Sequence, residues 1–151
     1  MSLDIALPRD RRNSGTLRLL DLASDTMLCA APCLAKADAQ GARRKGNPTR
    51  DPRRPWGDAP CGHYPRTRIV WFAERTPIGE AAIPLPLETA IGSEAEAART
   101  NGRSGLYIHA GRGSGRLRAT YGCVRLGFRD FVSLLHAIGE REVDVTIHQV
   151  D

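Results

Sequence analysis

Alternation of apolar and polar positions predicts strands at both ends of the chain. Near the C-terminus, Val143, Val145 and Ile147 alternate with polar residues, which is the period of a half-buried strand. Two short apolar runs, 16–21 and 26–31, are separated by Ala-Ser-Asp and indicate a hairpin or two successive strands. The fold is therefore expected to contain much β structure.

The middle of the chain predicts two further strands. Residues 67–72 and 106–109 are rich in β-branched, aromatic or aliphatic side chains. Residues 81–87 are interrupted by Pro84 and Pro86, and proline donates no hydrogen bond to a sheet. We therefore expect residues 81–87 to be irregular rather than a regular central strand.

A glycine-rich segment follows the strand predicted at 106–109. Residues 111–115 read Gly-Arg-Gly-Ser-Gly, a composition typical of a turn. Such a turn would bring residues 116–120 back beside the strand as a hairpin. His109 would then lie near the tip of that hairpin.

One helix is predicted by apolar residues at i, i+3, i+4 and i+7. These residues are Phe131, Leu134, Leu135 and Ile138. Asp130 is placed to cap the start of the helix, and Gly139 to end it. A shorter, exposed helix is expected over 93–100, with Ser93 as its cap and Glu96 completing a capping box. The predicted architecture is mainly β with one packed helix.

The length of 151 residues fits a single domain over 1–151. Residues 1–14 lack the apolar stretch of a secretory leader and are expected to be a flexible N-terminal segment. No later segment approaches the ~18 consecutive apolar residues of a membrane span, so membrane insertion is not expected. We expect a soluble protein without a leader, and a monomer.

The charge balance is basic, with 22 Lys and Arg against 17 Asp and Glu. The densest basic run lies within residues 38–60, among glycine, proline and aspartate and with few aromatic residues. This composition is typical of a long solvated surface loop and does not favour nucleic-acid binding. The excess of arginine mildly favours acidic or carboxylate-rich partners.

The four cysteines, Cys29, Cys33, Cys61 and Cys123, have irregular spacing and are interpreted as mostly free thiols. Cys29 and Cys33 have no second pair of ligands with metal-site spacing, so no metal and no other cofactor are expected. Cys61 and His63 form a thiol and imidazole pair two residues apart, which we interpret as structural.

The candidate chemistry lies in residues 105–131, where His109 precedes Cys123 by fourteen residues. An imidazole beside a thiol can accept the thiol proton and so raise the thiolate fraction, which thiol acyltransferases require. Gly122 lets the backbone approach a substrate closely, and the N–H groups of Gly122 and Cys123 are candidate donors to an oxyanion.

These residues carry a resemblance to a known family. Thr120-Tyr121-Gly122-Cys123-Val124-Arg125, with His109-Ala110 upstream, resembles the active-site signature of the L,D-transpeptidase catalytic domain, also called YkuD-like. Segments 47–52 and 55–64 also resemble the Gly-Asp and Thr-Pro segment of that family. The resemblance covers roughly residues 15–150. Two positions depart from the family pattern, because Tyr121 stands where many members have a second histidine and Ala110 where glycine is usual.

The resemblance implies a β-sandwich-like fold with a helix after the active-site cysteine. It implies that Cys123 attacks a carbonyl of a peptidoglycan stem peptide to form a thioester, and that His109 serves as base and then acid. The Ala110 position would orient His109 through backbone groups, and Arg125 would order a loop or meet a substrate carboxylate. Tyr121 and Thr120 are further candidate substrate contacts.

Several alternatives remain open at this point. A leaderless antibacterial effector of the same chemistry, a thiol peptidase or amidase of other specificity, and a catalytically silent wall-binding module all fit the sequence. An exported protein would act in the periplasm or cell wall, whereas a protein that stays inside would meet cytoplasmic precursors.

Overall fold

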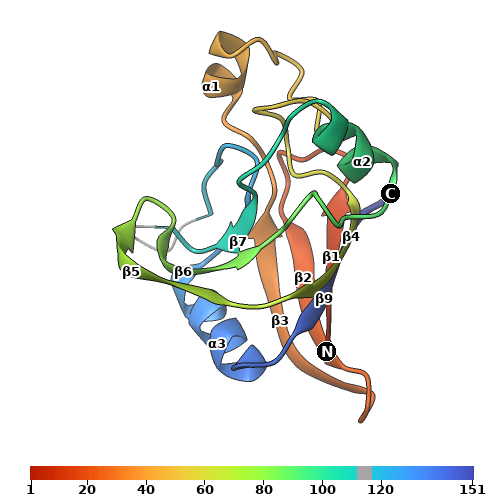
Figure 1. Cartoon of the computed structure of the whole chain (residues 1–151), viewed down its shortest axis with the longest axis vertical. Helices are drawn as coiled ribbons and strands as arrows, with labels where there is room; N and C mark the ends of the chain where they lie inside the picture. Colours follow the sequence, from red (N-terminus) through yellow and green to blue (C-terminus); the bar gives the residue numbers. More distant parts are fainter. Residues whose placement is uncertain (112–116) are drawn as a thin grey trace.

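The structure is a computed structural model that describes residues 1–111 and 117–151 (Figure 1). Nine strands lie in these ranges: β1 (Ser2–Pro8), β2 (Gly15–Asp21), β3 (Thr26–Leu34), β4 (Gly62–Thr67), β5 (Val70–Thr76), β6 (Gly79–Pro84), β7 (Tyr107–His109), β8 (Val124–Leu126) and β9 (Val143–Val150). The helices in the same ranges are α1 (Ala39–Arg44), α2 (Ser93–Thr100) and α3 (Phe128–Ile138).

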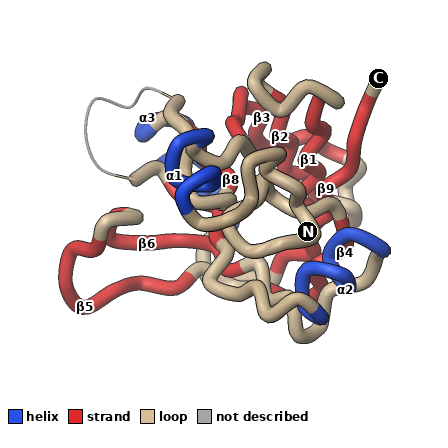
Figure 2. Tube along the Cα trace, turned by 90° about the horizontal axis from the view of Figure 1, so that it is seen from above, coloured by secondary structure: helices blue, strands red, loops and turns tan. Residues whose placement is uncertain are grey.

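The strands form one sheet in the order β4-β9-β1-β2-β3-β8-β7-β6-β5, and this sheet curls (Figure 1). Two neighbouring pairs are parallel, β1 with β9 and β7 with β8, and the other pairs are antiparallel. The β5–β6 hairpin projects away from β1, β2, β3 and β9 (Figure 2). The prediction of a mainly β protein is confirmed.

The N-terminal segment is part of the sheet. The expectation of a flexible segment over 1–14 was wrong for Ser2–Pro8, which pairs with β2 on one side and β9 on the other. Leu3, Ile5 and Leu7 alternate with less buried residues and are at most 1% exposed. The same period of two that identified β9 is therefore present here, and burial of these three side chains fixes the strand.

The strand that carries His109 does not form the predicted hairpin. β7 pairs in parallel with β8, with Ile108 opposite Val124, and residues 117–119 are not in a strand. Residues 112–115 of the predicted glycine-rich turn, and residue 116 of the predicted return segment, lie outside the described residues. A parallel pair requires a long connection, and the segment between His109 and Cys123 supplies it.

The proline-interrupted segment is also more regular than expected. Residues 79–84 form β6, which pairs with β5 on one side and β7 on the other. Pro84 is the last residue of the strand, where a missing N–H is tolerated. The strand predicted over 67–72 is divided between the end of β4 and the start of β5.

The helix prediction after Cys123 is confirmed, with a shift at its start. α3 begins at Phe128 with Gly127 as its N-cap, so Asp130 lies in the first turn and does not cap it. Gly139 ends the helix with φ of 60°. Phe131, Leu134 and Ile138 are buried against the sheet, and α3 packs next to β3.

The two other helices lie at the opposite end of the molecule from α3 (Figure 1). The short helix predicted over 93–100 is confirmed as α2, but Gly92 and not Ser93 is its N-cap, and Glu96 accepts a hydrogen bond from the Gly92 N–H. The loop expected over 38–60 contains the short helix α1. Among the described residues, no helix combines the length and the apolar character needed to cross a membrane.

Candidate functional site

The two candidate catalytic residues lie at, or directly beside, the ends of two neighbouring parallel strands. His109 ends β7, and Cys123 directly precedes β8. Ile108 and Val124 are register partners, both 0% exposed, and they point into the core. His109 and Arg125, the next pair in register, therefore share the opposite face, and Cys123 lies one residue before Val124 at the start of β8. No hydrogen bond joins the imidazole of His109 to Cys123 Sγ.

A cavity of about 520 Å³ opens on that shared face. Four segments contribute its walls: the loop before β4, the tip of the β5–β6 hairpin, the turn between α2 and β7, and the segment before β8. Five predicted site residues are among those lining it, namely His109, Thr120, Tyr121, Cys123 and Arg125. Ala110 lines a different, more apolar cavity beside α3.

The imidazole of His109 is buried and without hydrogen bonds. The residue is 4% exposed, and neither ring nitrogen has a hydrogen-bond partner among the described residues. Burial first, and the charge of Arg125 second, lower the pKa of His109 to about 4. The ring is therefore neutral at pH 7 and can accept a proton. The predicted orientation of His109 by backbone groups of Ala110 is not found, because no backbone group makes a hydrogen bond to the ring.

The thiol of Cys123 is also largely buried. The residue is 7% exposed, and Sγ makes a loose contact of 3.9 Å with the Gly105 carbonyl oxygen. Burial raises the pKa of Cys123, and this effect outweighs the lowering by the Tyr107 backbone and by the charge of Arg103. The resting pair is thus a neutral thiol and a neutral imidazole, rather than the thiolate-enriched pair that the sequence predicted.

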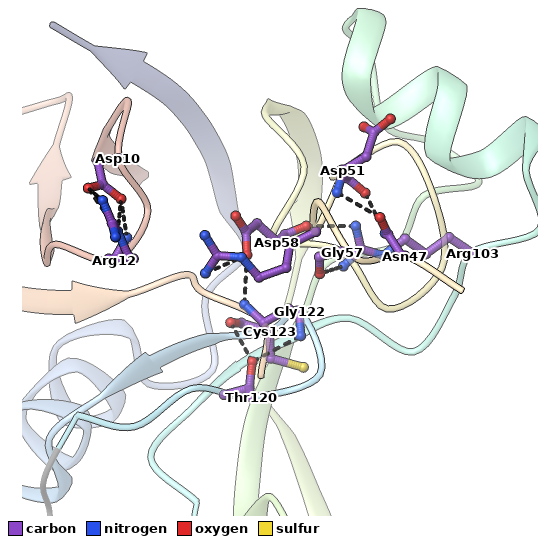
Figure 3. A network of polar contacts seen from close by, with 12 residues as sticks. Asp10, Arg12, Asn47, Asp51, Gly57, Asp58, Arg103, Thr120, Gly122 and Cys123 are labelled. Carbon is purple, nitrogen blue, oxygen red and sulfur yellow. Dashed lines mark hydrogen bonds and ion pairs between the residues drawn. The ribbon is translucent and has the colours of Figure 1, made fainter. Parts of the chain in front are cut away.

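The turn before Cys123 is closed by the hydroxyl of Thr120. Thr120 Oγ1 donates to the Cys123 carbonyl oxygen and accepts from the Gly122 N–H, both at 3.0 Å (Figure 3). The backbone of Thr120 is also bonded to that of Lys36 and Asp38. The Gly122 N–H is thus already used, which disfavours its predicted oxyanion role. Thr120 holds the turn in addition to lining the cavity.

Gly122 is required for a reason other than substrate approach. Its φ of 110° lies in the region that favours glycine. A Cβ there would overlap with Arg103 Nη2 and with the Gly57 carbonyl oxygen, and would lie 3.2 Å from Arg103 Cζ. The absence of a side chain at Gly122 therefore lets Arg103 and the loop around Gly57 come close to the backbone before Cys123.

Arg103 is a site residue that the sequence interpretation missed. It lies in the turn between α2 and β7, is 6% exposed and lines the cavity. Its guanidinium donates to the carbonyl oxygens of Gly57 and Asp58 (Figure 3) and to that of Pro52. The only sequence signal was an arginine among glycines shortly before His109, which does not reveal these distant partners.

The loop that Arg103 contacts is held by its own buried polar side chains. Asn47 is 1% exposed and bonds the backbone of Asp51 and Pro55 through three hydrogen bonds. Asp58 is 5% exposed and accepts from the Ala37 N–H at 2.8 Å. Burial raises the pKa of Asp58, and this N–H and three nearby arginine charges oppose the rise. These contacts fix the cavity wall formed by Pro55 and Trp56.

Aromatic residues occupy the rim of the cavity. Trp56 and Tyr121 pack edge to face with ring centroids 5.6 Å apart, and Lys45 Nζ lies 5.1 Å from the centre of the Trp56 ring. Tyr121 is 67% exposed, so most of its ring is available to a ligand. Arg125 is the register partner of His109, and its guanidinium packs against Gly111.

The other cysteines lie outside this cavity. Cys29, Cys33 and Cys61 are free thiols, as is Cys123, and burial raises the pKa of each. Cys61 Sγ accepts a hydrogen bond from Arg11 at 3.2 Å, and His63 Nδ1 lies 3.1 Å from Thr146 Oγ1. Within residues 1–111 and 117–151, no group of three or more histidine, cysteine or acidic side chains is arranged to hold a metal ion.

No protein-family model matches the chain, and no curated protein matches it in sequence.

Proposed function

We propose that this protein is a cysteine acyltransferase of the L,D-transpeptidase type, acting on peptidoglycan stem peptides through a thioester on Cys123. One observation carries the proposal. Cys123 and His109 line one cavity beside the parallel β7–β8 pair, and no described residue, Cys123 included, makes a hydrogen bond to either ring nitrogen of His109. A sulfur nucleophile and an available base thus face the same space. The likeness of residues 120–125 to the family signature supplies the reaction class and a β-sandwich-like fold.

The charge of the cavity supports a peptide that carries carboxylates. Arg103 and Arg125 line it, whereas none of the described lining residues is aspartate or glutamate. Stem peptides present a terminal carboxylate, and arginine is well suited to bind one. Trp56 and Tyr121 at the rim offer apolar surface to the remainder of such a ligand.

In the first half-reaction, Cys123 Sγ attacks the carbonyl carbon of the scissile amide while His109 takes the thiol proton. A carbon–sulfur bond forms, the carbon–nitrogen bond breaks, and the imidazolium returns the proton to the departing amine of the D-residue. Because the resting pair is neutral, proton transfer accompanies attack rather than preceding it. The product is a thioester on Cys123.

In the second half-reaction, an amine of another stem peptide, a free D-amino acid or water attacks the thioester carbon. Neutral His109 takes the proton of the attacking group, the carbon–sulfur bond breaks, and the proton returns to Cys123 Sγ. Cross-linking, exchange and carboxypeptidase activity differ only in which acceptor reaches the cavity.

The test is incubation of the protein with purified tetrapeptide and pentapeptide muropeptides, followed by mass spectrometry. Loss of the terminal D-residue, its exchange for an added D-amino acid, or dimer formation would each give a distinct mass and support the proposal. Cys123→Ser should abolish these changes and Cys61→Ser should retain them. Unchanged stems together with cleavage of an unrelated peptide would favour a thiol peptidase, and unchanged stems alone would contradict the proposed activity.

A further inference from the structure

Arg103 is held at the boundary between two parts of the cavity wall. Its Nη1 donates to Pro52 O at 2.5 Å and to Asp58 O at 2.7 Å, and its Nη2 donates to Gly57 O at 2.6 Å. Since all three acceptors are carbonyls of one loop, a single buried side chain ties that loop to the turn before β7. Loss of Arg103 would leave three buried or part-buried carbonyls without these donors.

The same guanidinium also lies against the segment that carries the nucleophile. Only a glycine at position 122 leaves room for Nη2 and Cζ of Arg103, and Cys123 is the next residue. Arg103 and Cys123 line the same cavity, and the charge of Arg103 acts on the Cys123 thiol in the direction that favours the thiolate. Figure 3 shows the hydrogen bonds of Arg103 with Gly57 and Asp58 near a second set, those of Thr120 with Gly122 and Cys123.

The charge of Arg103 is not neutralised by a contacting carboxylate. Among the described residues, its hydrogen bonds go to carbonyls only, and it forms no ion pair. The nearby carboxylate of Asp58 is instead bonded by the Ala37 N–H and lies 3.9 Å from Arg50 Nη1. A guanidinium has five N–H groups, so the three bonds to carbonyls leave two that can serve the cavity.

We propose that Arg103 is a positioning residue of the active site, which fixes the loop wall against the Gly122–Cys123 turn and stabilises negative charge on Cys123 Sγ. This inference rests on the proposed function and adds to it a source of positive charge beside the nucleophile. This role differs from the one expected of the Gly122 N–H, donation to a substrate oxyanion, because that N–H is bonded to Thr120. Stabilisation matters because burial opposes the thiolate, and a fixed cation nearby offsets part of that cost.

Arg99 provides a matched control from the same part of the chain. It lies in the last turn of α2, and its Nη1 donates to three backbone carbonyls, those of Leu87, Glu88 and Ala90, at 3.1, 3.3 and 3.4 Å. Arg99 is not among the residues that line the Cys123 cavity. Substitution of Arg99 therefore removes a loop-binding guanidinium without removing charge near the thiol.

The experiment measures the rate of iodoacetamide alkylation of the Cys123 peptide from pH 6 to 10 by quantitative mass spectrometry. The proteins are wild type, Arg103→Gln, Arg103→Lys, Arg99→Gln and Arg99→Lys, each with a recorded melting temperature. Arg103→Gln should raise the apparent pKa of Cys123 and slow alkylation at pH 8 roughly tenfold, as expected for one pKa unit. Arg103→Lys retains the positive charge but at a changed position, and should slow alkylation of Cys123 at pH 8 about threefold. Both Arg99 variants should match wild type.

Three results would overturn the inference: wild-type alkylation in both Arg103 variants, an equal change in the Arg99 variants, or a loss in Arg103→Lys as large as in Arg103→Gln. If Arg103→Gln does not fold, the alkylation rates of Arg103→Lys and Arg99→Lys are compared instead. A threefold difference between these rates supports the role of Arg103, and equal rates exclude it. The measurement needs no substrate. An Arg103 effect without muropeptide turnover would reject the proposed function only, and turnover without an Arg103 effect would reject this inference only.

Discussion

The chain contains two thiol and imidazole neighbourhoods, and they differ in what surrounds the reactive atoms. Cys61 and His63 are two residues apart, and each has a polar partner, Arg11 for the thiol and Thr146 for the ring. His109 and Cys123 are fourteen residues apart in the sequence. His109 ends β7 and Cys123 directly precedes β8. Both line one cavity, and no described residue makes a hydrogen bond to the ring of His109.

This comparison shows that nearness in sequence does not predict which thiol and imidazole line one cavity. A thiol that accepts a bond from a buried guanidinium is part of the packing, as is a ring in contact with a neighbouring hydroxyl. A buried imidazole without a partner is costly, because its polar atoms have lost water without replacement. That cost is understandable if the ring serves a ligand that enters the cavity.

The largest expected effect separates the two thiols. Cys123→Ser should lower the rate of muropeptide conversion by roughly 10³-fold or more, because the hydroxyl is a much weaker nucleophile and no thioester can form. Cys61→Ser should keep the rate within about twofold, since Cys61 lies outside the cavity. Product formation is followed by mass spectrometry. Comparable losses in the two variants would show that the thiols are not functionally distinct.

The second largest expected effect separates the two imidazoles, those of His109 and His63. His109→Gln should lower kcat by about 10²- to 10⁴-fold, the range usual for loss of a general base. His63→Gln replaces a ring in contact with Thr146 and should leave kcat within about twofold of wild type. Steady-state kinetics on a tetrapeptide stem provide the measurement. Full activity of His109→Gln would remove the base from the mechanism.

The buried imidazole should also make stability depend on pH. The pKa of His109 is about 4 in the folded protein and near its ordinary value of 6.5 when unfolded. The unfolded chain thus binds more protons in this window, so the free energy of unfolding should fall by up to about 3 kcal/mol as pH drops from 6.5 to 4.

His109→Gln should lose less stability than wild type over the same pH interval, because glutamine does not titrate. Urea denaturation at pH 7, 6, 5 and 4 measures the difference, and His63→Gln is the matched variant. The same pH dependence in wild type and His109→Gln would contradict the burial of a neutral ring at position 109.

The smallest effect is expected at the rim. Tyr121 is 67% exposed and lines the Cys123 cavity, whereas Trp71 is 69% exposed and lines the apolar cavity beside α3. Tyr121→Ala should raise KM for a muropeptide roughly 3- to 10-fold with kcat little changed, because it removes binding surface and not chemistry. Trp71→Ala should not change KM. Equal effects of the two substitutions would mean that the rim does not define the substrate site.

Local patterns predicted many elements of this fold. Alternation predicted β9, and the i, i+3, i+4, i+7 stripe predicted α3, because each pattern reflects one element packing against a core. Alternation at Leu3, Ile5 and Leu7 carried the same signal for β1, which was overlooked when residues 1–14 were interpreted as a flexible segment. Pairing was harder to predict, since nothing local distinguishes a parallel β7–β8 pair from a hairpin.

The site likewise contains residues that the sequence predicted and residues that it could not predict. The signature around Cys123 and the upstream His109 identified two residues that the fold brings to one cavity. Arg103 could not be found in this way, because its partners Pro52 and Gly57 are more than 40 residues away along the chain. The bond between Thr120 and Gly122 depends on the conformation of the turn, so it too is visible only in the folded chain.

The most direct test of a thioester on Cys123 is the intact mass of the protein during turnover. After rapid mixing with a tetrapeptide stem and acid quenching, the wild-type protein should gain the mass of the stem minus the mass of the free D-amino acid that is released. Peptide mapping should place this adduct on Cys123, and the adduct should be absent from Cys123→Ser and present in Cys61→Ser. Turnover of the stem without an adduct on Cys123, or an adduct on Cys61, would contradict the proposed mechanism.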